Sequence, residues 1–298
     1  MPIVTLPEAA EILAEGGLVA IPTETVYGLA ANALDGAAVA AVFARKGRPA
    51  GHPLILHARD PRPYARFDVR AERLSAFWPG PLAMVLPMVR ESGVVAEVTG
   101  CRDTIAVRCP DHPVTLALLA MLPFPLAAPS ANRFGQVSPT TAAHVLAAFP
   151  ELPVVDGGPC RVGLESTIVD LTGPIPAILR PGGIPADAVV LALGEELGAA
   201  GDTVAPGSLP AHYAPRARVV LAEDAASTVA ALRKAGIRAL SILRRPAPAY
   251  ARVLYAELRE ADAAGADVIV CEPAVVGGLG DAVNDRLRRA AASWGAPG

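Results

Sequence analysis

Residues 201–217 most limit the folds open to this chain, because they separate two stretches with different patterns of helices and strands. Positions 201–215 contain three prolines, two glycines and no apolar periodicity, as is typical of a linker. A chain of 298 residues is long enough for one large domain or two ordinary ones. The sequence therefore predicts a domain over 1–200, a linker over 201–217 and a small domain over 218–298.

The stretch before the linker alternates short apolar strands with helices, which predicts a large, twisted, mixed α/β sheet with helices packed against it. Its expected strands are 18–21, 53–57, 82–88, 104–109, 154–156, 166–171 and 177–180, and its expected helices are 7–15, 36–45, 71–77, 113–121, 139–149 and 186–197. After the linker, strands at 219–222, 239–243 and 267–271 alternate with helices at 225–235, 249–264 and 281–293. That alternation predicts a small, parallel, Rossmann-like α/β domain.

The charge balance favours small-molecule chemistry over nucleic-acid binding. The net charge is −3, and acidic and basic residues are interspersed along the chain. A protein that mainly binds nucleic acid usually has a basic surface and a high pI, whereas the pI here is about 6.0. A local basic cleft is still compatible with this composition.

The cysteines and the apolar windows predict the compartment. The four cysteines show no C-x-x-C spacing, so we expect small buried side chains in a reducing environment rather than a metal or redox site. The N-terminus has neither the basic start nor the apolar run of a signal peptide. The most apolar window, 114–129, is too short to span a bilayer. We therefore expect a cytoplasmic protein without a membrane segment.

Lys46-Gly47-Arg48-Pro49, which follows an expected helix, is the strongest local signal for chemistry. Two cations around a glycine at a helix end can bind a polyanion such as a triphosphate. The same residues also suit ordinary helix capping, in which Gly ends the helix and cations meet the negative end of its dipole. Only Lys46 and Lys234 of the 26 lysines and arginines are lysines. So rare a lysine can mark a position that needs a compact point charge, although chance alone would also leave two lysines somewhere.

Ser130-Ala131-Asn132 and Ser138-Pro139-Thr140-Thr141 form the second signal. Ser138 is suited to be the N-cap of a helix that has Pro139 at its first position, and free N–H groups there favour a phosphate or carboxylate. Plain capping without a ligand is the alternative.

Two further polar clusters lie beside expected strands, at 163–170 and in Leu179-Arg180-Pro181-Gly182. Either cluster can also be an ordinary set of polar and turn residues that ends a strand, without a role in binding. The sequence has no G-x-x-x-x-G-K-[ST] phosphate loop, no H-E-x-x-H and no G-x-S-x-G. The glycines at 277, 278 and 280 also lack the spacing of G-x-G-x-x-G, so phosphate-loop nucleotidases and dehydrogenases are disfavoured.

The order of these segments along the chain identifies a protein family more specifically than any single segment does. The sequence of 21–29, IPTETVYGL, followed by Lys46-Gly47-Arg48-Pro49, Ser130-Ala131-Asn132, ESTIV at 165–169 and Leu179-Arg180-Pro181-Gly182, resembles the YrdC-type threonylcarbamoyl-AMP synthases. His212-Tyr213-Ala214-Pro215 and GLGDAV at 278–283 resemble the longer, two-domain form of that family. The resemblance thus covers essentially the whole chain.

The resemblance implies a YrdC-like catalytic domain and a reaction. L-threonine and bicarbonate form a carbamate, which attacks the α-phosphate of ATP to give threonylcarbamoyl-AMP and pyrophosphate. A separate tRNA threonylcarbamoyl-transferase complex then modifies adenosine 37 of tRNA, so no stable tRNA binding is expected of this chain. Mg²⁺ is expected to accompany ATP without protein side-chain ligands, and no tightly bound organic cofactor is expected.

The resemblance also assigns residues to the two substrates. Lys46 and Arg48 are the expected catalytic cations, and His212 and Tyr213 are expected to fold back over the site, which makes the linker a lid. The full expected ATP set is Lys46, Arg48, His52, Thr104, Ser130, Asn132, Ser138, Arg180, His212 and Tyr213. The expected threonine set is Thr25, His57, Arg108, Ala128 and Ser166, with Arg108 paired to the substrate carboxylate.

His52 departs from the family pattern, which usually has Asn before this Pro-Leu. A histidine still donates to a phosphate oxygen, and its protonation near neutral pH would make ATP binding depend on pH.

Two other functions remain alternatives at this stage. A basic cleft formed by Lys46, Arg48, Arg108 and Arg180 would also suit an RNA-binding or ribosome-associated module, although only 4% of the residues are aromatic. A carbamoyl-transfer module of hydrogenase maturation proteins is disfavoured, because those proteins carry Cys-rich zinc segments.

Overall fold

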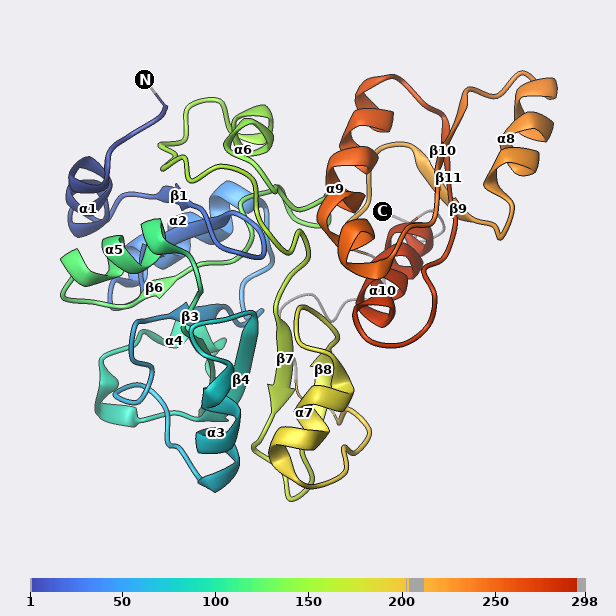
Figure 1. The fold of residues 1–298 in the computed structure, drawn as a ribbon. Coiled ribbons are helices and arrows are strands. Elements are labelled where there is room, and N and C mark those ends of the chain that lie inside the picture. Colours follow the sequence, from blue (N-terminus) through green and yellow to red (C-terminus); the bar gives the residue numbers. More distant parts are fainter. Residues whose placement is uncertain (1, 202, 204–211, 294–298) are drawn as a thin grey trace.

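The computed structural model describes residues 2–201, 203 and 212–293, which form two lobes of unequal size (Figure 1). We refer to residues 2–201 as the larger lobe, to 212–215 as the connecting segment and to 216–293 as the smaller lobe. Residues 202 and 204–211 of the predicted linker lie outside the described residues.

The larger lobe contains an eight-stranded sheet in the order β1-β2-β6-β3-β5-β4-β7-β8. The pairs β3–β5 and β4–β7 are parallel and the other neighbours are antiparallel. The predicted mixed sheet is therefore confirmed. The strands are β1 Val19–Ile21, β2 Gly28–Asn32, β3 Ile55–His57, β4 Leu82–Pro87, β5 Thr104–Arg108, β6 Leu126–Ala127, β7 Thr167–Asp170 and β8 Ala177–Arg180.

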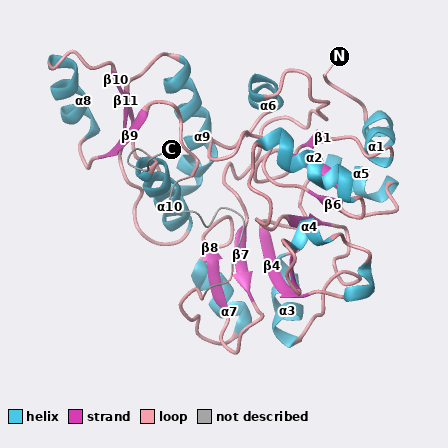
Figure 2. Cartoon of the chain, turned by 180° about the vertical axis from the view of Figure 1, so that it is seen from behind, coloured by secondary structure: helices cyan, strands magenta, loops and turns pink. Residues whose placement is uncertain are grey.

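Helices cover this sheet on both faces near β1 and β2 (Figure 2). Because side chains alternate along a strand, Ala20 and Leu29 join the main core, whereas Val19 and Ala30 pack on the opposite face with α1 and α5. The helices of this lobe are α1 Leu6–Ala14, α2 Gly36–Lys46, α3 Val69–Leu74, α4 Ala96–Thr99, α5 Pro113–Met121, α6 Ala142–Ala148 and α7 Ala186–Leu193, with 3₁₀ turns η1 Ser75–Phe77 and η2 Arg90–Ser92.

The smaller lobe is the predicted parallel α/β unit. Its sheet has the order β10-β11-β9, and both pairs are parallel. Helices α9 and α10 pack on one face of this sheet and α8 on the other. The elements are β9 Arg218–Leu221, α8 Ala225–Lys234, β10 Ala239–Ile242, α9 Ala247–Ala263, β11 Val268–Cys271 and α10 Leu279–Ala292.

One buried core joins the two lobes. Val26, Val137 and Leu164 of the larger lobe belong to the same cluster as Tyr213 of the connecting segment and Tyr255 of α9. These side chains are between 0% and 7% exposed. The contact between the lobes is therefore as dry as the interior of either one.

Two local predictions are wrong. Residues 154–156 form no named strand; Val154 makes only isolated bridges to Ile3 and Ala20, and Pro153 precedes it without an N–H to continue a ladder. The helix expected from Pro139 begins at Ala142, with Thr141 as its N-cap. The carbonyl of Pro139 instead accepts a hydrogen bond from the Tyr27 N–H, so it is not used to start the helix.

No helix in the described part of the chain is both long and apolar enough to cross a lipid bilayer.

Candidate active site

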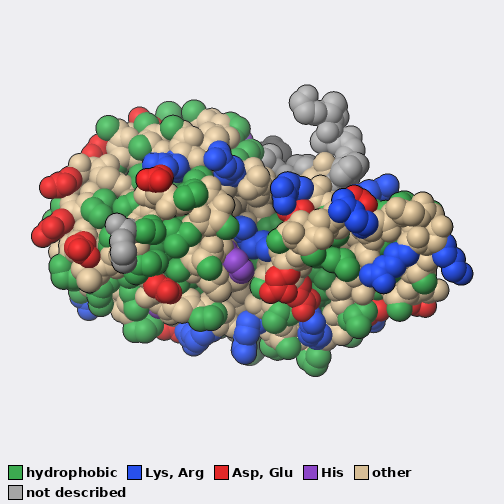
Figure 3. Space-filling model, turned by 90° about the horizontal axis from the view of Figure 1, so that it is seen from above, with side chains coloured by type: hydrophobic (Ala, Val, Ile, Leu, Met, Phe, Trp, Pro, Cys, Tyr) green, Lys and Arg blue, Asp and Glu red, His purple; other side chains and the backbone are tan. Residues whose placement is uncertain are grey.

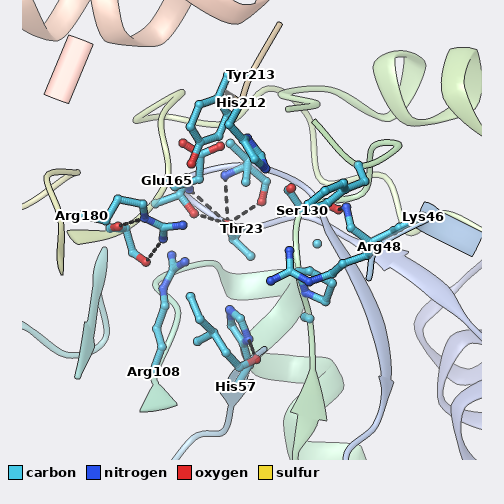
Figure 4. Close-up of a pocket in the computed structure, with 18 residues that line it drawn as sticks. Thr23, Lys46, Arg48, His57, Arg108, Ser130, Glu165, Arg180, His212 and Tyr213 are labelled. Atoms are coloured by element: carbon cyan, nitrogen blue, oxygen red, sulfur yellow. Dashed lines mark hydrogen bonds between the residues drawn. The ribbon is translucent and has the colours of Figure 1, made fainter. Parts of the chain in front are cut away.

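A pocket lies where the larger lobe meets the connecting segment, and it encloses about 630 Å³ of space, its mouth included. The part of this space that a water-sized sphere can enter is about 50 Å³, so the pocket is narrower than most small-molecule sites, which measure roughly 300–1,000 Å³. Figure 4 shows side chains from α2, β3, β5, β8 and the connecting segment converging on it. Its lining residues are Thr23, Thr25, Val26, Gly28, Lys46, Arg48, Ile55, His57, Arg108, Ala128, Pro129, Ser130, Phe134, Glu165, Ser166, Arg180, His212 and Tyr213.

Lys46 reaches the pocket from the last turn of α2. The helix ends there because Gly47 adopts a left-handed conformation, φ 64°, which favours glycine. The ammonium is buried, and it donates hydrogen bonds to the carbonyl oxygens of Ser130, at 2.5 Å, and Asn132, at 2.6 Å. Burial, and then the positive charge of Arg48, lower the pKa of Lys46 well below its ordinary value, against the opposing charge of Glu165.

Arg48 follows the same turn and is also buried. Its guanidinium donates to the carbonyl oxygen of Pro53 at 3.0 Å and lies 5.7 Å from the centre of the Phe134 ring. Burial lowers the pKa of Arg48 to about 10, with a smaller contribution from Arg180. Among the described residues neither Lys46 nor Arg48 forms an ion pair with a carboxylate. Two such cations suit a polyanion.

Arg108, at the end of β5, is held differently. Its Nη2 lies 2.6 Å from Oε1 of Glu24, and the two side chains are only 4% and 1% exposed. Its Nε donates to the carbonyl oxygen of Gly80 at 3.2 Å. The two groups form an ion pair, but the N–H groups of Nη2 are not aligned with the carboxylate oxygen or with any other described acceptor, so no hydrogen bond is formed there. The Arg108 side chain also lines the pocket.

Neutral polar groups lie around Arg108. Burial, reinforced by the charge of Arg108, lowers the pKa of His57 to about 3, so its imidazole is neutral at physiological pH. Its Nδ1 lies 3.1 Å from the carbonyl oxygen of Ile55, a pairing that needs a proton on Nδ1 and leaves Nε2 as an acceptor. The Thr25 hydroxyl lies 2.7 Å from that of Thr23, which itself donates to the carbonyl oxygen of Val26.

Arg180 forms the wall at the end of β8. Its Nε donates to the backbone oxygen of Ser166 at 3.0 Å and its Nη2 donates to the Ser166 hydroxyl at 3.1 Å. This double contact joins the end of β8 to the start of β7 and fixes the plane of the guanidinium.

An aromatic group closes the pocket on the side of the connecting segment. The ring centre of His212 lies 5.9 Å from that of Phe134 and 4.1 Å from that of Tyr213. Burial lowers the pKa of His212 to about 3, so this ring is also neutral. Two backbone hydrogen bonds hold the connecting segment there. The His212 N–H donates to the carbonyl oxygen of Arg289, and the Ala214 N–H donates to that of Gly135.

Most residues predicted from the sequence lie around this one pocket. Those that line it are Lys46, Arg48, Ser130, Arg180, His212, Tyr213, Thr25, His57, Arg108, Ala128 and Ser166.

Asn132 and Ser138 do not line the pocket. The Asn132 amide donates to the carbonyl oxygens of Arg133 and Gln136, so it shapes the loop whose backbone binds Lys46. Ser138 was expected to cap a helix, but it is fully buried and donates to Oε1 of Glu165 at 2.6 Å. Both act within the protein rather than at the cavity surface.

His52 and Thr104 also lie outside the lining. Thr104 is at the far end of β5 from Arg108, about 13 Å away at the usual strand rise. The His52 ring lies 6.1 Å from Phe134, behind the aromatic group. Burial, then Arg48 and Arg102, lower the pKa of His52 from 6.5, so its titration moves to more acid pH than the sequence suggested.

Sequence reasoning missed Glu24 and Glu165, although both stand inside recognised motifs. Burial of a carboxylate beside an arginine is not visible in a sequence. It also missed Phe134, which follows Ser130-Ala131-Asn132 by two positions and contacts both Arg48 and His212.

Comparison with known proteins agrees with this geometry. Residues 11–182 match the family described as "Telomere recombination", and residues 184–292 match "Threonylcarbamoyl-AMP synthase, C-terminal domain". The threonylcarbamoyl-AMP synthase of Pyrococcus abyssi is 41% identical over 95% of this chain and 92% of its own. The chain belongs to the threonylcarbamoyl-AMP synthase family. It is therefore an enzyme of the nucleotidyltransferase type.

Other relatives support the same family. The threonylcarbamoyl-AMP synthase of Bacillus subtilis is 34% identical over 96% of this chain and 92% of its own. The crystal structure of P. abyssi Sua5 complexed with L-threonine superposes with a TM-score of 0.90 at 39% identity, covering 97% of this chain and 94% of that one. HypF in a phosphate- and nucleotide-bound form shares only the fold, at 24% identity, a TM-score of 0.53 and 60% coverage of this chain, against 29% of its own.

Proposed function

We propose that this protein makes threonylcarbamoyl-AMP and pyrophosphate from L-threonine, bicarbonate and ATP, in this pocket. The observation that carries the proposal is the meeting of two kinds of cation. Lys46 and Arg48 are held by neutral carbonyl groups, whereas Arg108 is paired with Glu24. The first kind suits a triphosphate and the second suits the carboxylate of an amino acid.

The chemistry explains why cations are needed. The amino group of threonine and bicarbonate form a carbamate and water. A carbamate oxygen then bonds to the α-phosphorus of ATP while the bond from that phosphorus to the pyrophosphate oxygen breaks. Two like charges at 4 Å repel by about 4 kcal/mol at an effective dielectric constant of 20, so fixed positive charges must offset the approach of two anions.

The positions of the side chains indicate which residues bind each part of the two substrates. We assign the phosphates to Lys46, Arg48 and Arg180, with Ser130 beside them. The threonine carboxylate is assigned to Arg108. The remaining contacts to threonine come from Thr25, His57, Ala128 and Ser166, and His212 and Tyr213 cover the nucleotide.

Mg²⁺ fits this scheme as an ion carried by ATP, because phosphate oxygens are ligands that it prefers. Glu165 is the carboxylate that lines the pocket, and both of its oxygens already accept hydrogen bonds from protein donors. We therefore expect the phosphates rather than protein side chains to hold the ion.

The product would be consumed by a separate transferase that carries the threonylcarbamoyl group to tRNA. On the face shown in Figure 3, acidic and basic side chains are interspersed rather than gathered into a continuous basic surface. This face therefore offers no continuous basic surface for a tRNA backbone, in line with a chain that acts on small molecules. We propose that it does so in the cytoplasm.

Pyrophosphate release tests the proposal. Purified protein with ATP, Mg²⁺ and bicarbonate is expected to release pyrophosphate only when L-threonine is present. Lys46→Ala is expected to lower the rate by about 100-fold or more, because a charge at the phosphates is lost. Lys234→Ala, at an exposed position of α8, is the matched control and should match wild type. No release under any condition, together with salt-dependent tRNA binding, would instead favour the RNA-binding function.

A further inference from the structure

We infer that Arg286, on α10 of the smaller lobe, is a positioning residue for the nucleotide side of the pocket. It fixes Glu165 and the ring of Tyr213, and through them the wall that carries Arg180. The inference rests on the proposed function, and it gives the smaller lobe a part in positioning the groups that bind the nucleotide.

The contacts of Arg286 span three segments. Its side chain is fully buried; Nε donates to Oε2 of Glu165 at 2.8 Å and Nη2 donates to the carbonyl oxygen of Pro181 at 2.9 Å. Its Nη1 donates to Asp285 at 2.6 Å, and its guanidinium carbon lies 5.0 Å from the centre of the Tyr213 ring. One side chain therefore joins the approach to β7, the end of β8 and the connecting segment.

Tyr255 of α9 completes the arrangement from the same lobe. Its hydroxyl donates to Oε2 of Glu165 at 2.8 Å, and its ring stacks on that of Tyr213 at an interplanar angle of 24°, with centres 5.9 Å apart. Oε1 of Glu165 accepts from the Ser138 hydroxyl at 2.6 Å. Glu165 is thus bonded to one group of its own lobe and to two groups of the other.

The two segments bonded by Arg286 also touch each other. Gly182 follows Pro181, and a side chain there would collide with the backbone of Thr167, Glu165 and Ser166. This close approach requires glycine. Because the segments move together, a change at Glu165 or Pro181 is transmitted to Ser166 and to Arg180, which is bonded to it.

Electrostatics gives Arg286 a second role. Burial opposes the charge of Glu165, yet Arg286, then Arg180 and the Ser138 hydroxyl, hold the pKa of Glu165 at about 2. The carboxylate is therefore ionised beside a pocket that must bind phosphates. Arg286 neutralises that charge from behind, which offsets the repulsion between Glu165 and a bound phosphate.

The main test compares steady-state constants of variants. Arg286→Met keeps most of the apolar volume and removes the charge, and it is expected to raise the KM for ATP at least 10-fold while the KM for L-threonine changes less than 2-fold. Arg245→Met is the matched control, because Arg245 pairs with Glu257 within the smaller lobe and does not touch the pocket. It should leave both constants unchanged.

A double variant separates positioning from a loss of folding. Arg286→Met with Glu165→Gln removes the uncompensated charge together with its partner, and it is expected to recover at least 3-fold of the loss in kcat/KM for ATP. Equal changes in both KM values, or no recovery in the double variant, would overturn the inference. Tyr255→Phe is the alternative if Arg286→Met does not fold, because it removes only the hydroxyl that bonds to Glu165. It is expected to raise the KM for ATP about 3-fold. An unchanged KM for ATP would contradict the inference.

Failure of the proposed function and failure of this inference give different results. Wild-type protein that releases no pyrophosphate with threonine would refute the proposed function, and the inference with it. Normal wild-type release with an unaltered Arg286→Met variant would refute only the role of Arg286.

Discussion

The pocket holds buried positive charge in two ways. Lys46 and Arg48 are bound by backbone carbonyl groups, so their charges are not compensated by a carboxylate among the described residues. Arg108 lies 2.6 Å from Glu24 in a pair whose net charge is zero. We refer to these as the uncompensated site and the compensated site.

The difference corresponds to the net charges of the proposed ligands. A triphosphate is a polyanion, and it supplies the counter-charge that Lys46 and Arg48 lack. Threonine is a zwitterion without net charge, and the pair of Arg108 and Glu24 beside it also has no net charge. The protein thus bears an energetic cost at the uncompensated site in the absence of ATP, and a smaller one at the compensated site, where the attraction between Glu24 and Arg108 offsets part of the desolvation.

Glu24→Gln should have the largest effect on stability. It leaves the buried Arg108 charge without its partner, so the free energy of unfolding in urea is expected to fall by about 3 kcal/mol. Glu72→Gln is the control, because Glu72 pairs with Arg62 at the surface, where such pairs contribute at most about 1 kcal/mol. Equal losses in the two variants would mean that Arg108 does not depend on Glu24.

Arg48→Met should weaken ATP binding and spare threonine binding. A hydrogen bond to a charged group contributes about 1.5–3 kcal/mol, so the Kd for ATP measured by calorimetry is expected to rise roughly 10- to 100-fold. Arg90→Met, at an exposed pair with Asp103, is the control. A comparable loss of threonine affinity would show that the two sites are not distinct.

Acid should destabilise the protein through the histidines of both sites. The pKa of His57 and of His212 is about 3 in the folded protein, whereas it is about 6.5 in an unfolded chain. Below pH 6.5 the unfolded chain therefore binds protons that the folded protein does not. The free energy of unfolding is expected to fall by up to about 1.4 kcal/mol per pH unit for each group between pH 6 and 4. His57→Gln should flatten the profile, and an unaltered slope would contradict this account.

Lys46→Met should have the smallest effect on the ligand-free protein, although it removes a proposed catalytic group. It loses two hydrogen bonds but also the penalty of a buried, uncompensated charge. The free energy of unfolding without ATP is expected to change by no more than about 1 kcal/mol. A loss near that of Glu24→Gln would mean that the two sites hold charge in the same way.

The sequence predicted the fold well where patterns are regular. The parallel order of the smaller lobe and the mixed sheet of the larger one follow from the alternation of strands and helices. Strand β2 was missed because Gly28–Asn32 reads GLAAN, which has no β-branched or aromatic residue. Its place in the sheet comes from pairing with β1 and β6, which is tertiary information.

The pocket was predicted through motifs, and the limits of the prediction follow from that. Lys46, Arg48, Arg108 and Arg180 lie together as expected. A motif does not say which side chain faces the cavity and which lies behind it, so Ser138 was assigned to the ligand although it binds Glu165. Contacts between distant segments, such as Arg286 with Glu165, have no local signal in the sequence.

The apolar core shared by Val26, Val137, Leu164 and Tyr255 has a consequence for how the molecule comes apart. Separating the lobes would expose these side chains to water, so neither lobe can loosen without a free-energy cost borne by the other. Melting should then proceed as one cooperative event despite two separate sheets. Two fragments produced by a cut between the lobes would remain associated, because the surface that joins them does not depend on the chain that connects them.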